Sequence, residues 1–154
     1  MVKILGGVNH MEYTVDELVK KSRNKADYKE RIEAIKELAK IDCPQRKDVI
    51  VNLAIHDRVF AVKEAAHHEA QKLKLTKNGK PISLGKKDIG YSNGDIVKKL
   101  ARVKRESKMD EFDCAEFKER FKTVDPEMYD VLQFEKSSKF DSYLENQYKC
   151  LPKN

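Results

Sequence analysis

The sequence predicts an all-α fold in which two helix pairs stack on a C-terminal helical bundle. Apolar residues recur through most of the chain at the i, i+3, i+4 and i+7 spacing of helices with one buried side. Only 4 Pro and 6 Gly occur in 154 residues, so few positions oppose helix formation. A partial repeat with a 32-residue offset in the first half indicates consecutive, similar helix pairs.

The first helix pair is predicted over residues 14–22 and 27–41. The capping box Thr14-x-x-Glu17 opens the shorter helix, because the two side chains can satisfy free backbone N–H groups at its start. The second pair is predicted over residues 46–56 and 58–73, where apolar residues again form a stripe.

Moving residues 11–42 forward onto 43–74 superposes similar side chains. The matches include Asp16 on Asp48, Tyr28 on Phe60, Arg31 on Lys63, Ala34 on Ala66, and Glu37 on Glu69. Small Ala residues let paired helices approach closely. The basic residue after Val62 can bridge to the Asp of a neighbouring repeat.

The second copy resembles the HEAT-repeat family. The residues that carry the resemblance are Leu53-Ala54-Ile55-His56-Asp57, Val62-Lys63, Ala66, Ala70 and Leu73. The first copy departs from the pattern, with Glu30-Arg31 where Val-Arg would stand and Lys25 where the Asp would stand. The resemblance covers roughly residues 11–74 and implies an α-solenoid fragment that binds partners on its surface. An ordinary antiparallel bundle with an accidental echo is the alternative.

Residues 75–92 form a predicted basic loop between the repeats, 1–74, and a C-terminal helical part, 93–154, that packs on them. Asn78-Gly79 is a strong turn signal, and the flanking residues Leu75, Thr76, Ile82 and Leu84 predict a short β-hairpin within the loop.

Four helices are predicted in the C-terminal part, over residues 93–106, 110–123, 126–136 and 139–149. Three of them have sequence signals for their first turn: Ser92-x-x-Asp95, Asp125-Pro126 and Ser138-x-x-Asp141. The aromatic stripes of these helices are expected to form core; they include Phe117, Phe121, Phe140, Tyr143 and Tyr148.

Composition and cysteine content exclude several classes of protein. No run of about 18 apolar residues is present, so no membrane helix is expected. The apolar run at residues 1–8 is too short for a secretory signal. Cys43, Cys114 and Cys150 are odd in number and widely spaced, which does not indicate a disulfide framework. We therefore expect a cytoplasmic protein.

Positive charge is concentrated in one segment. Residues 72–108 carry 12 basic and 3 acidic side chains, whereas the whole chain has a formal net charge of +6. Within the predicted helix 93–106, three basic residues share one face at i, i+4 and i+7. The candidate contacts to nucleic acid or to an acidic partner are Lys86, Lys87, Lys98, Lys99, Arg102 and Arg105. A solvated face without a function is the alternative.

Other candidate sites are incomplete. Glu64 and His68 share a helix face beside His67 and Glu69, but zinc takes about four ligands and nothing nearby completes the set. Cys43 lies near a predicted helix start, which can lower a thiol pKa, yet no paired His or Asn is indicated. Neither Gly6-Gly7 nor the later glycines (Gly79, Gly85 and Gly90) fit a phosphate-binding loop.

We therefore expect a non-catalytic protein without cofactor or metal. The favoured function is that of a small adaptor or regulator that binds a protein partner through its helical-repeat surface. The alternative is a nucleic-acid-binding protein that contacts phosphates through residues 72–108.

Overall fold

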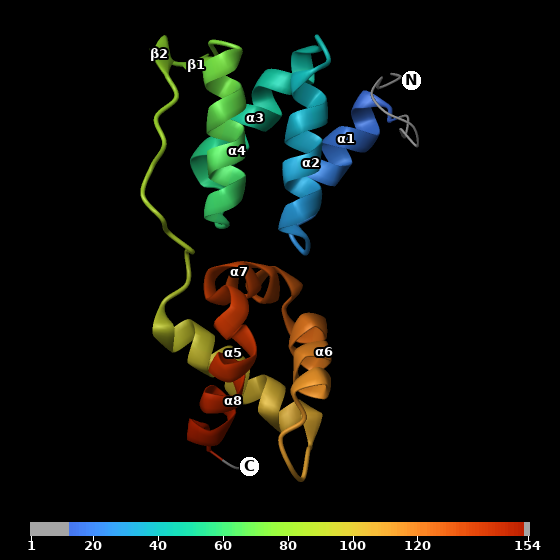
Figure 1. Ribbon diagram of the computed structural model, residues 1–154, viewed down its shortest axis with the longest axis vertical. Coiled ribbons are helices and arrows are strands. Elements are labelled where there is room, and N and C mark those ends of the chain that lie inside the picture. Colours follow the sequence, from blue (N-terminus) through green and yellow to red (C-terminus); the bar gives the residue numbers. More distant parts are fainter. Residues whose placement is uncertain (1–12, 153–154) are drawn as a thin grey trace. The chain divides into compact units, whose positions relative to one another are not determined.

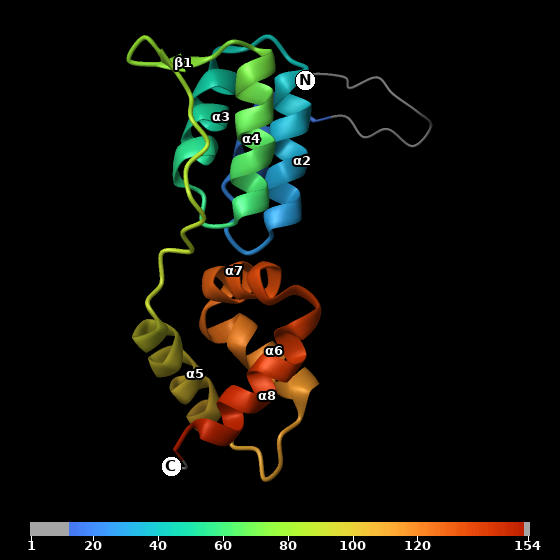
Figure 2. The same ribbon diagram turned by 60° about the vertical axis from the view of Figure 1, so that its left-hand side comes forward.

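The computed structural model describes residues 13–152, and the apolar run at residues 1–8 with Gly6-Gly7 lies outside this range. Contacts divide the chain into two compact units, Met1–Asp88 and Ile89–Asn154, which are described in turn (Figures 1 and 2). Apart from one two-stranded hairpin, the described elements are helices. The predicted all-α class and the predicted hairpin are both confirmed.

The first unit contains two helix pairs. Helix α1 (Val15–Ser22) pairs with α2 (Tyr28–Ala39), and α3 (Pro44–His56) pairs with α4 (Phe60–Lys72). The two pairs meet chiefly where α2 lies beside α4 (Figure 1). The predicted apolar stripes face this interior: Leu18, Ala34, Ile35, Leu38, Ile50, Val62 and Ala66 are all fully buried.

Local capping explains where these helices begin. The Thr14 hydroxyl accepts a hydrogen bond from the Glu17 N–H at 3.0 Å, as the capping box predicts. Helix α3 begins earlier than predicted, at Pro44, because proline is well suited to the first helical position. Helix α4 begins later than predicted, at Phe60, because Val59 before it has an extended backbone.

A short hairpin follows α4, with strands β1 (Thr76–Lys77) and β2 (Lys80–Pro81). Asn78 and Gly79 both have positive φ, as a tight two-residue turn requires, so Lys77 pairs with Lys80. The hairpin is shorter than the predicted one that reaches Leu84. Pro81 has no N–H to continue the ladder.

The second unit contains α5 (Asn93–Ser107), α6 (Cys114–Val124), α7 (Pro126–Lys136), a 3₁₀ turn (Ser137–Lys139) and α8 (Phe140–Cys150). Its predicted aromatic core is present. Tyr129 meets both Phe121 and Phe140 edge to face, each with ring centroids 5.4 Å apart. Phe117 is fully buried and meets Tyr148 at 5.7 Å.

Two predicted helix starts in this unit are confirmed with their caps, one start is wrong, and one predicted cap is wrong. Ser92 with Asp95 forms a complete capping box, and Asp125 caps α7 with Pro126 in its first turn. Helix α6 starts at Cys114 rather than at residue 110, since the Asp113 side chain caps it there. Ser138 does not cap α8, because it lies inside a 3₁₀ turn that runs directly into the helix, whereas an N-cap needs an extended backbone.

Candidate functional site

The six candidate residues of the basic segment lie in different units. Lys86 and Lys87 belong to the first unit, in the extended segment that follows the hairpin, and both are exposed. The Lys87 ammonium lies 5.4 Å from the ring centroid of Phe60, at the start of α4. The other four residues lie on α5 in the second unit.

On α5 the predicted stripe is exposed. Lys98, Arg102 and Arg105 are all exposed, and the Arg102 guanidinium forms an ion pair with Glu106 one turn later. The pKa of Glu106 is lowered by the hydrogen bond from Arg102 and by the nearby positive charges of Arg102, Arg120 and Arg105. The charges of three arginines therefore act on one carboxylate, so the net charge of these groups stays positive.

Arg120 was missed at the sequence level. It lies on α6, in the acidic last third of the chain, and its charge acts on Glu106 because α6 packs against α5. Only a predicted pairing of these two helices would have connected it with the basic segment.

Two other basic residues of α5 have structural partners. The Lys99 ammonium lies 3.4 Å from Oδ2 of Asp125, and this same carboxylate caps α7. The Lys104 ammonium donates to the carbonyl oxygens of Tyr148 and Leu151 at 2.7 and 2.8 Å. Lys104 thereby satisfies the C-terminal end of α8, where free carbonyls concentrate negative charge.

The first unit carries an open groove of about 560 Å³ that no sequence motif indicated. Its length follows α3, whose lining residues include Lys47, Val51 and Ile55. The C-terminal end of α1 contributes Ser22 and Arg23, and the hairpin contributes Thr76, Lys77 and Asn78. Val51 and Ile55 are half-buried, so the groove presents apolar surface between charged edges.

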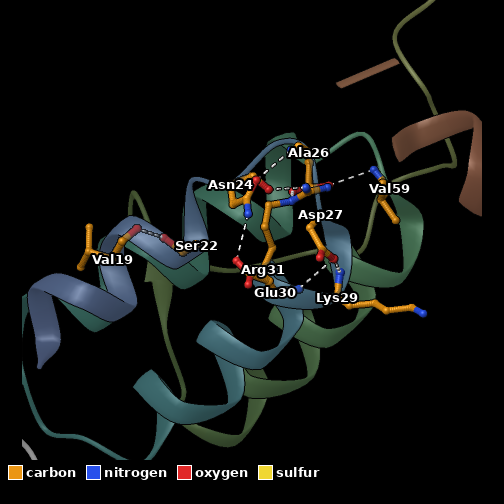
Figure 3. Close-up of polar contacts among 10 residues, drawn as sticks. Val19, Ser22, Asn24, Ala26, Asp27, Lys29, Glu30, Arg31 and Val59 are labelled. Atoms are coloured by element: carbon orange, nitrogen blue, oxygen red, sulfur yellow. Dashed lines mark hydrogen bonds and ion pairs between the residues drawn. The ribbon is translucent and has the colours of Figure 1, made fainter. Parts of the chain in front are cut away.

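A buried ion pair fixes the elements at one end of this groove. The Arg31 Nε and Nη2 atoms donate to the two carboxylate oxygens of Asp57 at 2.8 and 3.1 Å, and the side chains are only 5% and 6% exposed. Arg31 Nη1 also donates to the Asn24 carbonyl at 2.8 Å (Figure 3). Asn24 follows α1 and Asp57 follows α3, so one guanidinium connects the two helix ends that border the groove.

The same carboxylate organises the turn between α3 and α4. Asp57 Oδ1 accepts the N–H of Val59 at 2.9 Å. The bridge that the repeat pattern suggests between a basic residue and a neighbouring Asp is thus made by Arg31, the counterpart of Lys63 in the first copy. Lys63 itself is 8% exposed, and it forms no ion pair within residues 13–152.

The candidates for metal or thiol chemistry remain incomplete. Within the described residues, no group of three or more His, Cys, Asp and Glu side chains is placed to hold a metal ion. Cys43 is the N-cap residue of α3 but makes no capping hydrogen bond with its side chain. Burial raises the pKa of the Cys114 thiol, and the Asp141 carboxylate acts in the same direction, which is opposite to the activation of a nucleophile.

No protein-family model, curated protein or solved structure matches this chain. In the part of the chain that the structure describes, no helix is both long and apolar enough to cross a membrane.

Proposed function

We propose that the chain is a non-catalytic interaction module, an adaptor or regulator whose first unit binds a protein partner. The observation that carries this proposal is the groove along α3, where half-buried Val51 and Ile55 lie between charged residues of three elements. Interfaces commonly combine an apolar centre with a polar rim. The HEAT-repeat resemblance supports the same function, since it implies helix pairs that present a binding surface.

The buried pair of Arg31 and Asp57 adds support. It connects consecutive helix pairs through a bidentate, charge-assisted contact, which holds the binding surface in one geometry. A surface organised before binding loses less conformational entropy when a partner docks.

The test is site-specific photocross-linking of the full chain in native-host extract. A benzophenone amino acid is placed at Asn52 on α3, at Lys36 on α2, or at Lys139 in the second unit. We expect a protein that cross-links from the first unit and that, once purified, binds the purified chain. Absence of any such protein, or a partner that cross-links only from Lys139, would contradict the proposal.

A second candidate is nucleic-acid binding, favoured by the exposed Arg102 and Arg105 on α5, with the charge of Arg120 acting on the same Glu106. With Lys98 on the same face of α5, these groups can neutralise several phosphates. No aromatic ring is needed for contacts to a phosphate backbone, so duplexes are the expected ligands.

Fluorescence anisotropy of labelled duplex DNA, single-stranded DNA and RNA across a salt series tests this candidate. The variant Lys98→Glu plus Arg102→Glu should abolish binding. The variant Lys29→Glu plus Lys36→Glu, which changes the charge equally on exposed positions of α2, should weaken binding by less than about twofold. Equal losses in both variants would indicate a general charge effect and would rule out an α5 site.

A further inference from the structure

The face of α3 that lines the groove has a regular composition. Its lining residues include Lys47, Val51 and Ile55, which follow one another at steps of four and lie on one side of the helix. Asn52 and His56 flank them. From Lys47 to His56 this side of the helix extends over about 14 Å, which matches about four residues of an extended peptide.

The charges around the groove are mostly positive. Arg23, Lys47 and Lys77 come from α1, α3 and the hairpin, while Asp48 is the one acidic residue in the lining. All four are exposed. Within residues 13–152, none of the three basic residues forms an ion pair. Positive charge from three separate elements therefore converges on one apolar strip without being neutralised.

The lining does not suit single-stranded nucleic acid. It contains no Phe, Tyr or Trp side chain on which bases could stack, and its centre is aliphatic. An acidic segment with aliphatic side chains would satisfy both features, because its apolar groups would cover Val51 and Ile55 while its carboxylates meet the basic edges.

We infer that the groove between α1, α3 and β1 binds a linear acidic segment of a partner protein that carries aliphatic residues. This inference rests on the proposed function and specifies its ligand. Two aliphatic side chains of the segment lie along Val51 and Ile55, and its carboxylates face Arg23, Lys47 and Lys77.

The test starts with selection of a phage-displayed library of random 12-residue peptides on the immobilised full chain. We expect enriched peptides with net negative charge and at least two aliphatic residues. Synthetic, labelled copies are then titrated by fluorescence anisotropy. Lys47→Glu plus Lys77→Glu should raise the Kd about tenfold or more, and Arg23→Glu from the opposite wall should act in the same direction.

Controls locate the effect. Lys29→Glu plus Lys36→Glu carries the same charge change on α2 and should alter the Kd by less than about twofold. Peptide binding should shift the backbone amide resonances of Val51, Asn52 and Ile55. Circular dichroism spectra should show that all variants keep the wild-type helix content.

Three results would overturn the inference: no enrichment over an unrelated bait, enriched peptides without acidic excess, or acidic peptides whose binding ignores the groove variants. Each of these is distinguishable from failure of the proposed function. If a partner still cross-links from Asn52, the chain is an interaction module whose groove takes a different ligand, and if it cross-links only from Lys36, the first unit binds through a surface other than the groove. If neither experiment gives binding to the first unit, the proposed function fails as well.

Discussion

Replacing Asp57 with alanine would remove the buried acceptor that pairs with Arg31 at the end of α3. Arg31 would lose two charge-assisted hydrogen bonds, at 2.8 and 3.1 Å, and its guanidinium would remain in a site where the side chain is 5% exposed. The Val59 N–H would lose its acceptor at 2.9 Å. Removal of one partner from a buried ion pair costs about 3–5 kcal/mol. We expect Asp57→Ala to lower the free energy of unfolding of the first unit by this amount.

Two further variants separate charge from hydrogen bonding. Asp57→Asn keeps an acceptor for Val59, so it should cost about 1 kcal/mol less than Asp57→Ala. The double variant Arg31→Met plus Asp57→Ala leaves no unpaired buried charge. Its cost should therefore be smaller than the sum of the single costs by about 2 kcal/mol.

Hydrogen exchange of the full chain, followed by mass spectrometry, measures these costs separately in each unit. Protected amides of α2 and α4 should exchange about 150- to 5,000-fold faster in Asp57→Ala, since about 1.36 kcal/mol of the expected cost corresponds to one factor of ten. Amides of the second unit serve as the internal reference. A cost below about 1 kcal/mol, or strictly additive single costs, would refute the argument that this pair holds the two helix pairs together.

Four smaller perturbations test other contacts. Lys104→Ala removes two hydrogen bonds to carbonyl oxygens at the end of α8, so it should cost about 1–3 kcal/mol and lower the melting temperature. An unchanged melting temperature would mean that these carbonyl groups do not need Lys104 as a donor. Ser92→Ala removes the cap of α5 and should cost about 1 kcal/mol in urea unfolding. Lys63→Met should cost less than about 1 kcal/mol, because no ion pair in residues 13–152 is lost, and a cost as large as that of Asp57→Ala would reveal one. A hydrogen bond from Lys21 lowers the pKa of Glu33 below its ordinary 4.5, so the pair stabilises the fold above that pH and this contribution disappears as pH falls through the lowered value. The contribution should be about 0.2–1 kcal/mol, because the Glu33 side chain is half exposed. Urea titrations at a series of pH values should show this pH dependence in the wild type and not in Glu33→Gln.

Helix positions were predictable because their signals are local. Each helix needs one apolar stripe, and the stripe repeats within a few residues along the sequence. The Asn78-Gly79 pair determined the hairpin turn for the same reason, since both residues accept positive φ. The error at Ser138 is instructive: the sequence of a capping box is present, but the chain enters the helix from a 3₁₀ turn and the backbone is not extended there.

The candidate binding surfaces were only partly predictable, because they combine residues from separate elements. The stripe of Lys98, Arg102 and Arg105 follows from one helix, whereas Arg120 joins it through the packing of α6 on α5. The groove requires α1, α3 and the hairpin to be in place, and no single segment carries its pattern. The net charge of residues 72–108 also counts Lys104 with the other basic residues, although its ammonium group is hydrogen-bonded to carbonyl oxygens at the end of α8.

Salt dependence separates the two binding surfaces, although both attract negative charge. On α5 and α6, four basic groups are opposed by one carboxylate, that of Glu106; the four are Lys98, Arg102, Arg105 and Arg120. Together they can neutralise about three phosphates of a duplex, which gives a slope of about −2.7 in log K against log salt. Duplex affinity should then fall about 40-fold between 50 and 200 mM salt and keep falling. Peptide affinity at the groove should fall severalfold and then level off near 1 M salt, where the Debye length is about 3 Å, because burial of Val51 and Ile55 is not screened. A peptide affinity that declines without levelling would mean that the apolar strip contributes nothing, and the assignment of an aliphatic acidic ligand would fail on that point.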